Sequence, residues 1–282
     1  MKKIIQIYFQ FISILSPSWA ARQAFSMFQI PMNKKIRQKE LPFFETSHGF
    51  KVPWHLEKIQ CYELGPKDGS LIFCVHGWES NAACFSAIAH RLADNGHRVI
   101  LFNLPAHGFS KLKRANLKIC AEAFLAVIAY MNPKEPFSVV AHSFGSAVSS
   151  YALSKTTYTV DHLIFLTTPD QIREVFQEFA DFVRLSQAAF LKTLAIAEEL
   201  LDESIDQVRV STIGKKLNYQ NLLIIHDTKD KVISIEKAQT VQQHWKKSRL
   251  IEIEGTGHYR MLWNPEVIQK VSEQIGVLAS SV

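Results

Sequence analysis

The stretch that decides the fold runs from residue 137 to residue 153 and reads FSVVAHSFGSAVSSYAL. Its apolar start predicts a buried strand, and the small residues in its second half are compatible with a helix. The residues between these parts, 141–145, must then form a tight turn around Ser143. Only small side chains fit two places either side of such a turn, and Ala141 and Gly145 meet that requirement. Ser143 is therefore a candidate nucleophile, although a plain turn would use the same residue types.

Later segments carry the acid and the base that such a serine needs. Residues 221–225, NLLII, predict a buried parallel strand whose carboxyl end continues into the polar loop HDTKDKV. Residues 249–253 predict the following strand, and the glycine-rich turn after it carries His258. Serine, then acid, then histidine is the chain order of α/β-hydrolases and of neither major serine protease family.

On these residues the chain resembles the α/β-hydrolase superfamily, over roughly residues 55–280. Residues 71–78, LIFCVHGW, look like the third strand and oxyanion loop of that family. Residues 99–110, VILFNLPAHGFS, look like the next strand and the loop Asp-x-Pro-Gly-His-Gly-x-Ser, from which Asn103 and Ala106 depart. The resemblance implies an α/β fold with a mostly parallel central sheet flanked by helices and a small helical cap inserted after the sixth strand.

Acyl transfer assigns a role to each part of this site. A serine hydroxyl is a poor nucleophile near neutral pH, so His258 must accept the proton of Ser143 during attack and return it to the leaving group. In the family, the backbone amide after His-Gly and the amide after the nucleophile bind the oxyanion. The resemblance therefore implies that the amides of Trp78 and Phe144 form the oxyanion hole.

Two aspartates compete for the role of the acid that orients the histidine. The family pattern His-x-x-x-Asp-x-x-Val/Ile aligns with His226, Asp230 and Ile233, which favours Asp230. Asp227 is the rival, but its place at the strand end suits a turn cap better. The predicted triad is Ser143, Asp230 and His258.

The resemblance implies a serine hydrolase that cleaves a small-molecule carboxylic ester through an acyl-enzyme and needs no cofactor. Thioesterase, acyltransferase and carbon–carbon hydrolase stay open, because they share the triad and differ in pocket shape. The other alternative is a non-catalytic member that binds a ligand, against which an intact triad argues. Histidines fall at several predicted strand ends, but no spacing typical of a metal centre accompanies them, so no metal is expected. The histidines besides His258 are interpreted as braces for the surrounding loops: His76, His107 and His142.

The basic charge of the chain is concentrated near its start. Residues 1–40 contain seven Lys or Arg residues and one acidic residue, whereas the rest has 25 of each sign. A neutral remainder argues against nucleic-acid binding, which needs a sustained basic surface. The cysteines lack metal-ligand spacing and indicate reduced thiols and a cytoplasmic protein.

Residues 1–54 are predicted to form a helical extension before a hydrolase domain at 55–282. Residues 4–15 are apolar except for three polar positions at helical spacing, which suits a helix that is buried on most sides or lies at an interface. The segment is too short to span a membrane. The helix is therefore predicted either to dock on the hydrolase domain or, as the more specific hypothesis, to make peripheral contact with a membrane. The alternative is export, with residues 1–20 as a signal peptide.

An insertion of roughly fifty residues separates the sixth strand from the strand at Leu222, far beyond a normal connection. Apolar residues recur through it near the 3.6-residue period, which predicts helices throughout. The resemblance implies that these helices, at about residues 168–216, form a cap that shapes the acyl or leaving-group pocket.

Overall fold

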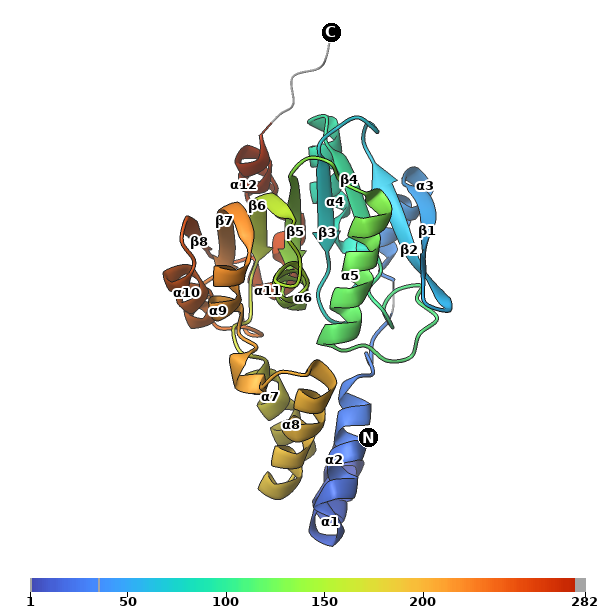
Figure 1. Cartoon of the computed structure of the whole chain (residues 1–282), viewed down its shortest axis with the longest axis vertical. Helices are drawn as coiled ribbons and strands as arrows, with labels where there is room; N and C mark the ends of the chain where they lie inside the picture. The colour runs from blue at the N-terminus through green and yellow to red at the C-terminus, as the bar shows by residue number, and fades with distance from the viewer. Residues whose placement is uncertain (1, 35, 277–282) are drawn as a thin grey trace. The chain divides into compact units, whose positions relative to one another are not determined.

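The computed structural model describes residues 2–34 and 36–276, and within them eight strands form one sheet (Figure 1). The strand order is β1-β2-β4-β3-β5-β6-β7-β8. The first two strands pair antiparallel, as do β2 and β4, and every later neighbour is parallel. This arrangement confirms the predicted fold, a mostly parallel sheet flanked by helices. The strands are β1 His48–Trp54, β2 Glu57–Leu64, β3 Leu71–Val75, β4 Arg98–Phe102, β5 Phe137–His142, β6 Thr159–Leu166, β7 Asn218–Asp227 and β8 Ser248–Ile253.

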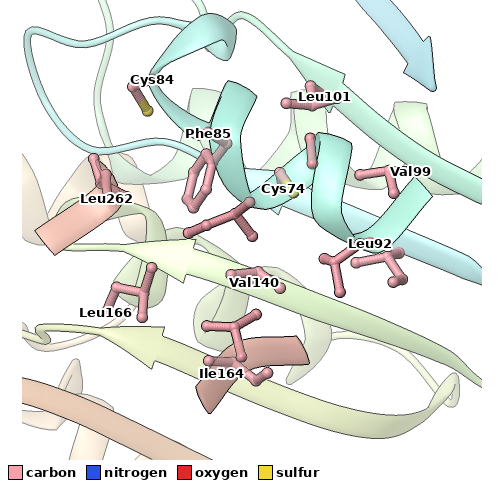
Figure 2. Close-up of a cluster of buried hydrophobic side chains, with 14 of the residues drawn as sticks. Cys74, Cys84, Phe85, Leu92, Val99, Leu101, Val140, Ile164, Leu166 and Leu262 are labelled. Atoms are coloured by element: carbon pink, nitrogen blue, oxygen red, sulfur yellow. The ribbon is translucent and has the colours of Figure 1, made fainter. Parts of the chain in front are cut away.

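Alternating side chains of the central strands build a core on each face of the sheet. On one face, residues such as Val140 and Ile164 pack with Leu92 of a flanking helix in the cluster drawn in Figure 2. On the other face, the ring of Phe124 contacts Phe73 and stacks on Phe102. Because the central strands are covered on both faces, their sequences are continuous runs of apolar residues. The helices of this part are α3 Leu41–Thr46, α4 Ser86–Asp94, α5 Leu117–Met131, α6 Phe144–Leu153, α9 Val210–Ile213, α10 Ile235–His244, α11 Gly257–Arg260 and α12 Pro265–Ile275.

The chain divides into two compact units, and each contains segments that are distant in sequence. The helical unit comprises Met1–Pro31 and Gln171–Arg209, and the sheet unit comprises Met32–Asp170 and Val210–Val282. The long helices of the helical unit are α1 Lys2–Leu15, α2 Pro17–Phe28, α7 Ile172–Val183 and α8 Gln187–Leu201.

The N-terminal helices and the insertion share one small core. Phe9 and Ile12 of α1 pack with alanines of α2 and with Val183 at the end of α7. Phe28 stacks on Phe176, with ring centroids 4.4 Å apart. Because this cluster takes side chains from both segments, burial of apolar surface favours their association.

The unit boundaries differ from the boundaries expected from sequence. The sequence predicts that residues 48–54 belong to the helical extension, but they form β1, whose Val52 is buried beside Ile59 of β2. The insertion contributes residues 171–209 to the helical unit, whereas α9 belongs to the sheet unit. The alternation of apolar and polar residues in FKVPW covers only five positions, which is too few to predict a strand. The pairing with β2 is visible only in the structure.

Candidate active site

Ser143 lies between the end of β5 and the first residue of α6, as predicted. Its backbone has φ +53° and ψ −122°, a conformation that non-glycine residues rarely adopt and that costs of order 1–3 kcal/mol. Gly145 explains how the turn stays tight, because a Cβ there would lie 2.1 Å from the carbonyl oxygen of Val75. The amide of Ser143 donates to the carbonyls of Leu166 and Thr167, at 3.2 Å each, which ties the turn to the end of β6.

The structure brings Ser143, His258 and Asp230 together. The Nε2 atom of His258 lies 3.1 Å from the Oγ atom of Ser143, and its Nδ1 atom lies 2.8 Å from Oδ2 of Asp230. A carboxylate can only accept, so Nδ1 carries the proton and Nε2 is left to accept one from the serine. The arrangement has the geometry of a nucleophile, a general base and an orienting acid.

Asp230 is held as a carboxylate by several donors. Its Oδ1 atom accepts the amides of Val232 and Ile233, at 2.7 and 3.1 Å, and its Oδ2 atom also accepts the Thr167 hydroxyl at 3.3 Å. Burial alone would raise the pKa of Asp230, but the hydrogen bonds from His258 and these amides outweigh it and lower the pKa to about 2. The acid is therefore ionised across the range in which a histidine base works.

Asp227, the rival acid, is used differently. It is buried, and its Oδ2 atom accepts the amides of Thr256 and Gly257, at 2.6 and 2.7 Å, and the Thr256 hydroxyl at 2.8 Å. Its Oδ1 atom accepts the amide of Lys229 at 2.8 Å. Asp227 thus joins the loop that carries Asp230 to the turn that precedes His258. The turn-cap interpretation anticipated the Lys229 contact but not the link between the loops.

The remaining histidines of the site are buried and brace its loops. Burial, and then the nearby His258, lower the pKa of His142 to about 3, so its ring is neutral at pH 7. Its Nε2 atom donates to the backbone carbonyl of His258 at 2.8 Å, which helps to hold the turn that carries His258. His76 accepts the Leu104 amide at 3.0 Å and has a pKa held well below the ordinary value by burial. These contacts agree with the bracing role expected for them.

The two predicted oxyanion residues lie beside the nucleophile. Gly77 approaches it so closely that a Cβ there would lie 3.1 Å from the Cβ of Ser143. Trp78 follows directly, and its ring meets the ring of Phe144 edge-on with centroids 5.5 Å apart. Phe144 is the first residue of α6, and amides of the first helical turn have no acceptor within their own helix.

Sequence reasoning missed Thr167 and Thr256. Thr167 follows β6 with φ +58°, and its hydroxyl lies between Asp230 and the His226 ring. Its place at the carboxyl end of a central parallel strand was the available signal, because sites in such sheets form at that edge. The departures Asn103 and Ala106 lie apart from the triad contacts: Asn103 accepts the Ala82 amide at 2.9 Å, and Ala106 adopts φ +65°.

Comparisons with known proteins agree with this architecture. A family model described as the alpha/beta hydrolase fold matches residues 70–202. A serine hydrolase-like protein from Dictyostelium discoideum is 27% identical over 204 residues, which cover 60% of this chain and 56% of that protein. The match therefore spans little more than half the length of that relative.

Solved structures share the fold at low sequence identity. An esterase from Pyrococcus furiosus superposes with a TM-score of 0.65 and 14% identity, covering 88% of this chain and 96% of that one. The thioesterase domain from the curacin biosynthetic pathway superposes with a TM-score of 0.62 and 15% identity, covering 82% of this chain and 100% of that domain. One fold thus accommodates both an esterase and a thioesterase.

Proposed function

Because this chain belongs to the α/β-hydrolase superfamily, we propose that it is a serine hydrolase that cleaves a carboxylic ester through an acyl-enzyme. The observation that carries the proposal is the continuous hydrogen-bonded series from Ser143 through His258 to Asp230, with contacts of 3.1 and 2.8 Å. An inert turn serine has no need for a strained backbone, a histidine at its hydroxyl and a carboxylate behind that histidine.

In the acylation step, the Oγ atom of Ser143 attacks the ester carbonyl while Nε2 of His258 takes its proton. The carbonyl oxygen becomes an oxyanion, for which the amides of Trp78 and Phe144 are the proposed donors. Collapse of this intermediate breaks the bond to the leaving alkoxide, which receives the proton from His258. The acyl group is then an ester of Ser143.

In the deacylation step, His258 takes a proton from water, and the resulting hydroxide attacks the acyl carbonyl. Collapse releases the carboxylic acid and returns the proton to the Oγ atom of Ser143. Asp230 stays ionised throughout and stabilises the imidazolium that forms twice in each cycle. Because the buried His142 ring is neutral, it adds no second positive charge beside that imidazolium.

A fluorophosphonate probe tests the proposal, because it reacts with activated serines. We expect labelling of the native chain and loss of labelling in Ser143→Ala, while Ser154→Ala, a serine at the end of the same helix, keeps it. Nitrophenyl esters of increasing acyl length, with matched thioesters, then measure the preferred bond. Absence of Ser143-dependent labelling in a folded protein would sink the proposal and favour a ligand-binding member. Turnover of thioesters alone would restrict it to thioesterase chemistry.

A further inference from the structure

Helix α1 places its polar and apolar residues in an unusual way within the helical unit. The Nε2 atom of Gln6 donates to the carbonyl of Phe182 at 2.9 Å, and the hydroxyl of Ser13 accepts the amide of Ser186 at 3.3 Å. Two of its three polar positions between residues 4 and 15 are therefore used on the face that packs against α7 and α8. Phe9 and Ile12 fill the rest of that face.

The opposite face of α1 is apolar and exposed. Its six large side chains are between 41% and 81% exposed, and we call them the outer stripe: Ile4, Ile7, Tyr8, Phe11, Ile14 and Leu15. At 3.6 residues per turn these positions fall within an arc of about 120°. A helix of a soluble protein ordinarily directs such an arc toward its core. Here the core side is already occupied, so the outer stripe is a second apolar face.

The residues around the outer stripe indicate what covers it. Trp19 of α2 is 46% exposed, and its ring meets that of Tyr8 with centroids 6.1 Å apart. Tryptophan and tyrosine are enriched where apolar and polar parts of a bilayer meet. Residues 1–31 contain no Asp or Glu, and the exposed Lys3 and Arg22 complement an anionic lipid surface. Lys2 is on the packed side of α1, where its Nζ atom lies 5.1 Å from the centroid of the Phe182 ring.

The length of α1 limits how it can meet a bilayer. Its 14 residues extend about 21 Å, less than the roughly 30 Å of a hydrocarbon core. Among the residues that the structure describes, none of the helices meets the length and apolarity needed to span a membrane. An amphipathic helix of this kind lies in the plane of the interface, with its apolar face among the acyl chains.

From these observations we propose that the outer stripe is a docking surface for an anionic lipid membrane, on which α1 lies parallel to the bilayer plane. Apolar burial supplies the attachment, and Lys3 and Arg22 add attraction to anionic headgroups. The proposal is independent of the chemistry at Ser143, because it involves only α1 and α2.

Sedimentation of the full-length chain with vesicles made of equal parts phosphatidylglycerol and phosphatidylcholine tests the docking. We expect the native chain to pellet and the double variant Ile7→Glu/Phe11→Glu to show at least a tenfold lower partition coefficient. A matched control, Val175→Glu/Leu191→Glu, places the same charges on exposed apolar positions of α7 and α8 and is expected to keep most of the binding. Lys3→Gln/Arg22→Gln should weaken binding to these vesicles but not to phosphatidylcholine alone.

Two further measurements distinguish a membrane from a second copy of the chain as the group that covers the outer stripe. The fluorescence of Trp19 should shift to shorter wavelength on binding, and Trp19→Phe should remove that shift. Light scattering gives the mass in solution without lipid. A native chain that stays in the supernatant, or a stripe variant that binds as well as the native chain, overturns the proposal. A dimer that becomes a monomer in Ile7→Glu/Phe11→Glu, without vesicle binding, assigns the outer stripe to a second copy instead.

Discussion

The sheet unit and helix α1 use hydrogen-bonded polar side chains for different purposes. At the carboxyl ends of the strands, Asp227 and Asp230 accept hydrogen bonds from amides and hydroxyls that fix two loops of the candidate site. In α1, Gln6 and Ser13 attach one helix to another, while the outer stripe faces solvent. The first arrangement is complete in itself and suits a preorganised reaction site. The second leaves apolar surface exposed, which is the basis of the proposed membrane-docking surface.

The largest effect should come from the acid of the proposed triad. We expect Asp230→Asn to lower kcat on a reactive ester by about 10⁴-fold, because the amide would favour the wrong tautomer of His258. Steady-state kinetics measures the loss, and circular dichroism checks that the fold is kept. A loss of less than tenfold would show that another group orients the histidine.

Two phenylalanines on α1 compare its packed and exposed faces directly. Phe9 is 3% exposed and Phe11 is 62% exposed. We expect Phe9→Ala to lower the free energy of unfolding of the helical unit by about 3–5 kcal/mol, because it opens a cavity in a small core. Phe11→Ala should change it by less than about 0.5 kcal/mol. Urea unfolding followed by circular dichroism measures both, and equal losses would mean that the outer stripe is packed.

Asp227 separates a positioning role from a catalytic one. Asp227→Asn keeps the size of the side chain but removes the charge that the amides of Thr256 and Gly257 contact. We expect the free energy of unfolding to fall by about 2–4 kcal/mol. Displacement of His258 should also lower kcat, by about 10–100-fold. If Asp227→Asn reduced kcat as much as Asp230→Asn while leaving stability unchanged, the roles of the two aspartates would be reversed.

The smallest effect is the dependence of stability on acid pH. The pKa of Asp230 is lowered to about 2 in the folded chain, so its ionised form stabilises the fold above the unfolded pKa. That contribution is lost as the pH falls from about 4 to about 2, and we expect it to be about 1 kcal/mol after solvent screening. Thermal unfolding of the native chain and of Asp230→Asn, followed from about pH 5 to about pH 2, measures this contribution. A native curve no steeper than that of the variant would contradict the assigned shift.

The sequence by itself determined the fold and the location of the candidate site. The turn at Ser143 depends on local requirements, namely a strand, small flanking residues and a helix, which a short stretch displays completely. The resemblance to the family pattern that aligns His226 and Asp230 favoured this acid over its rival, and the structure places Asp230 against His258. The first inference needed only local residues, and the second needed the family pattern as well as the order of the strands.

Only the tertiary structure decided the parts that depend on residues far apart in the chain. Asp227 acts through an amide 29 residues away, and Gln6 bonds a carbonyl 176 residues away. Helical periodicity shows that α1 has two faces, but either face could be the packed one. The choice was made by the insertion, in which the Phe182 carbonyl of α7 accepts a hydrogen bond from Gln6 and the Ser186 amide before α8 donates one to Ser13. These contacts leave the outer stripe exposed to solvent.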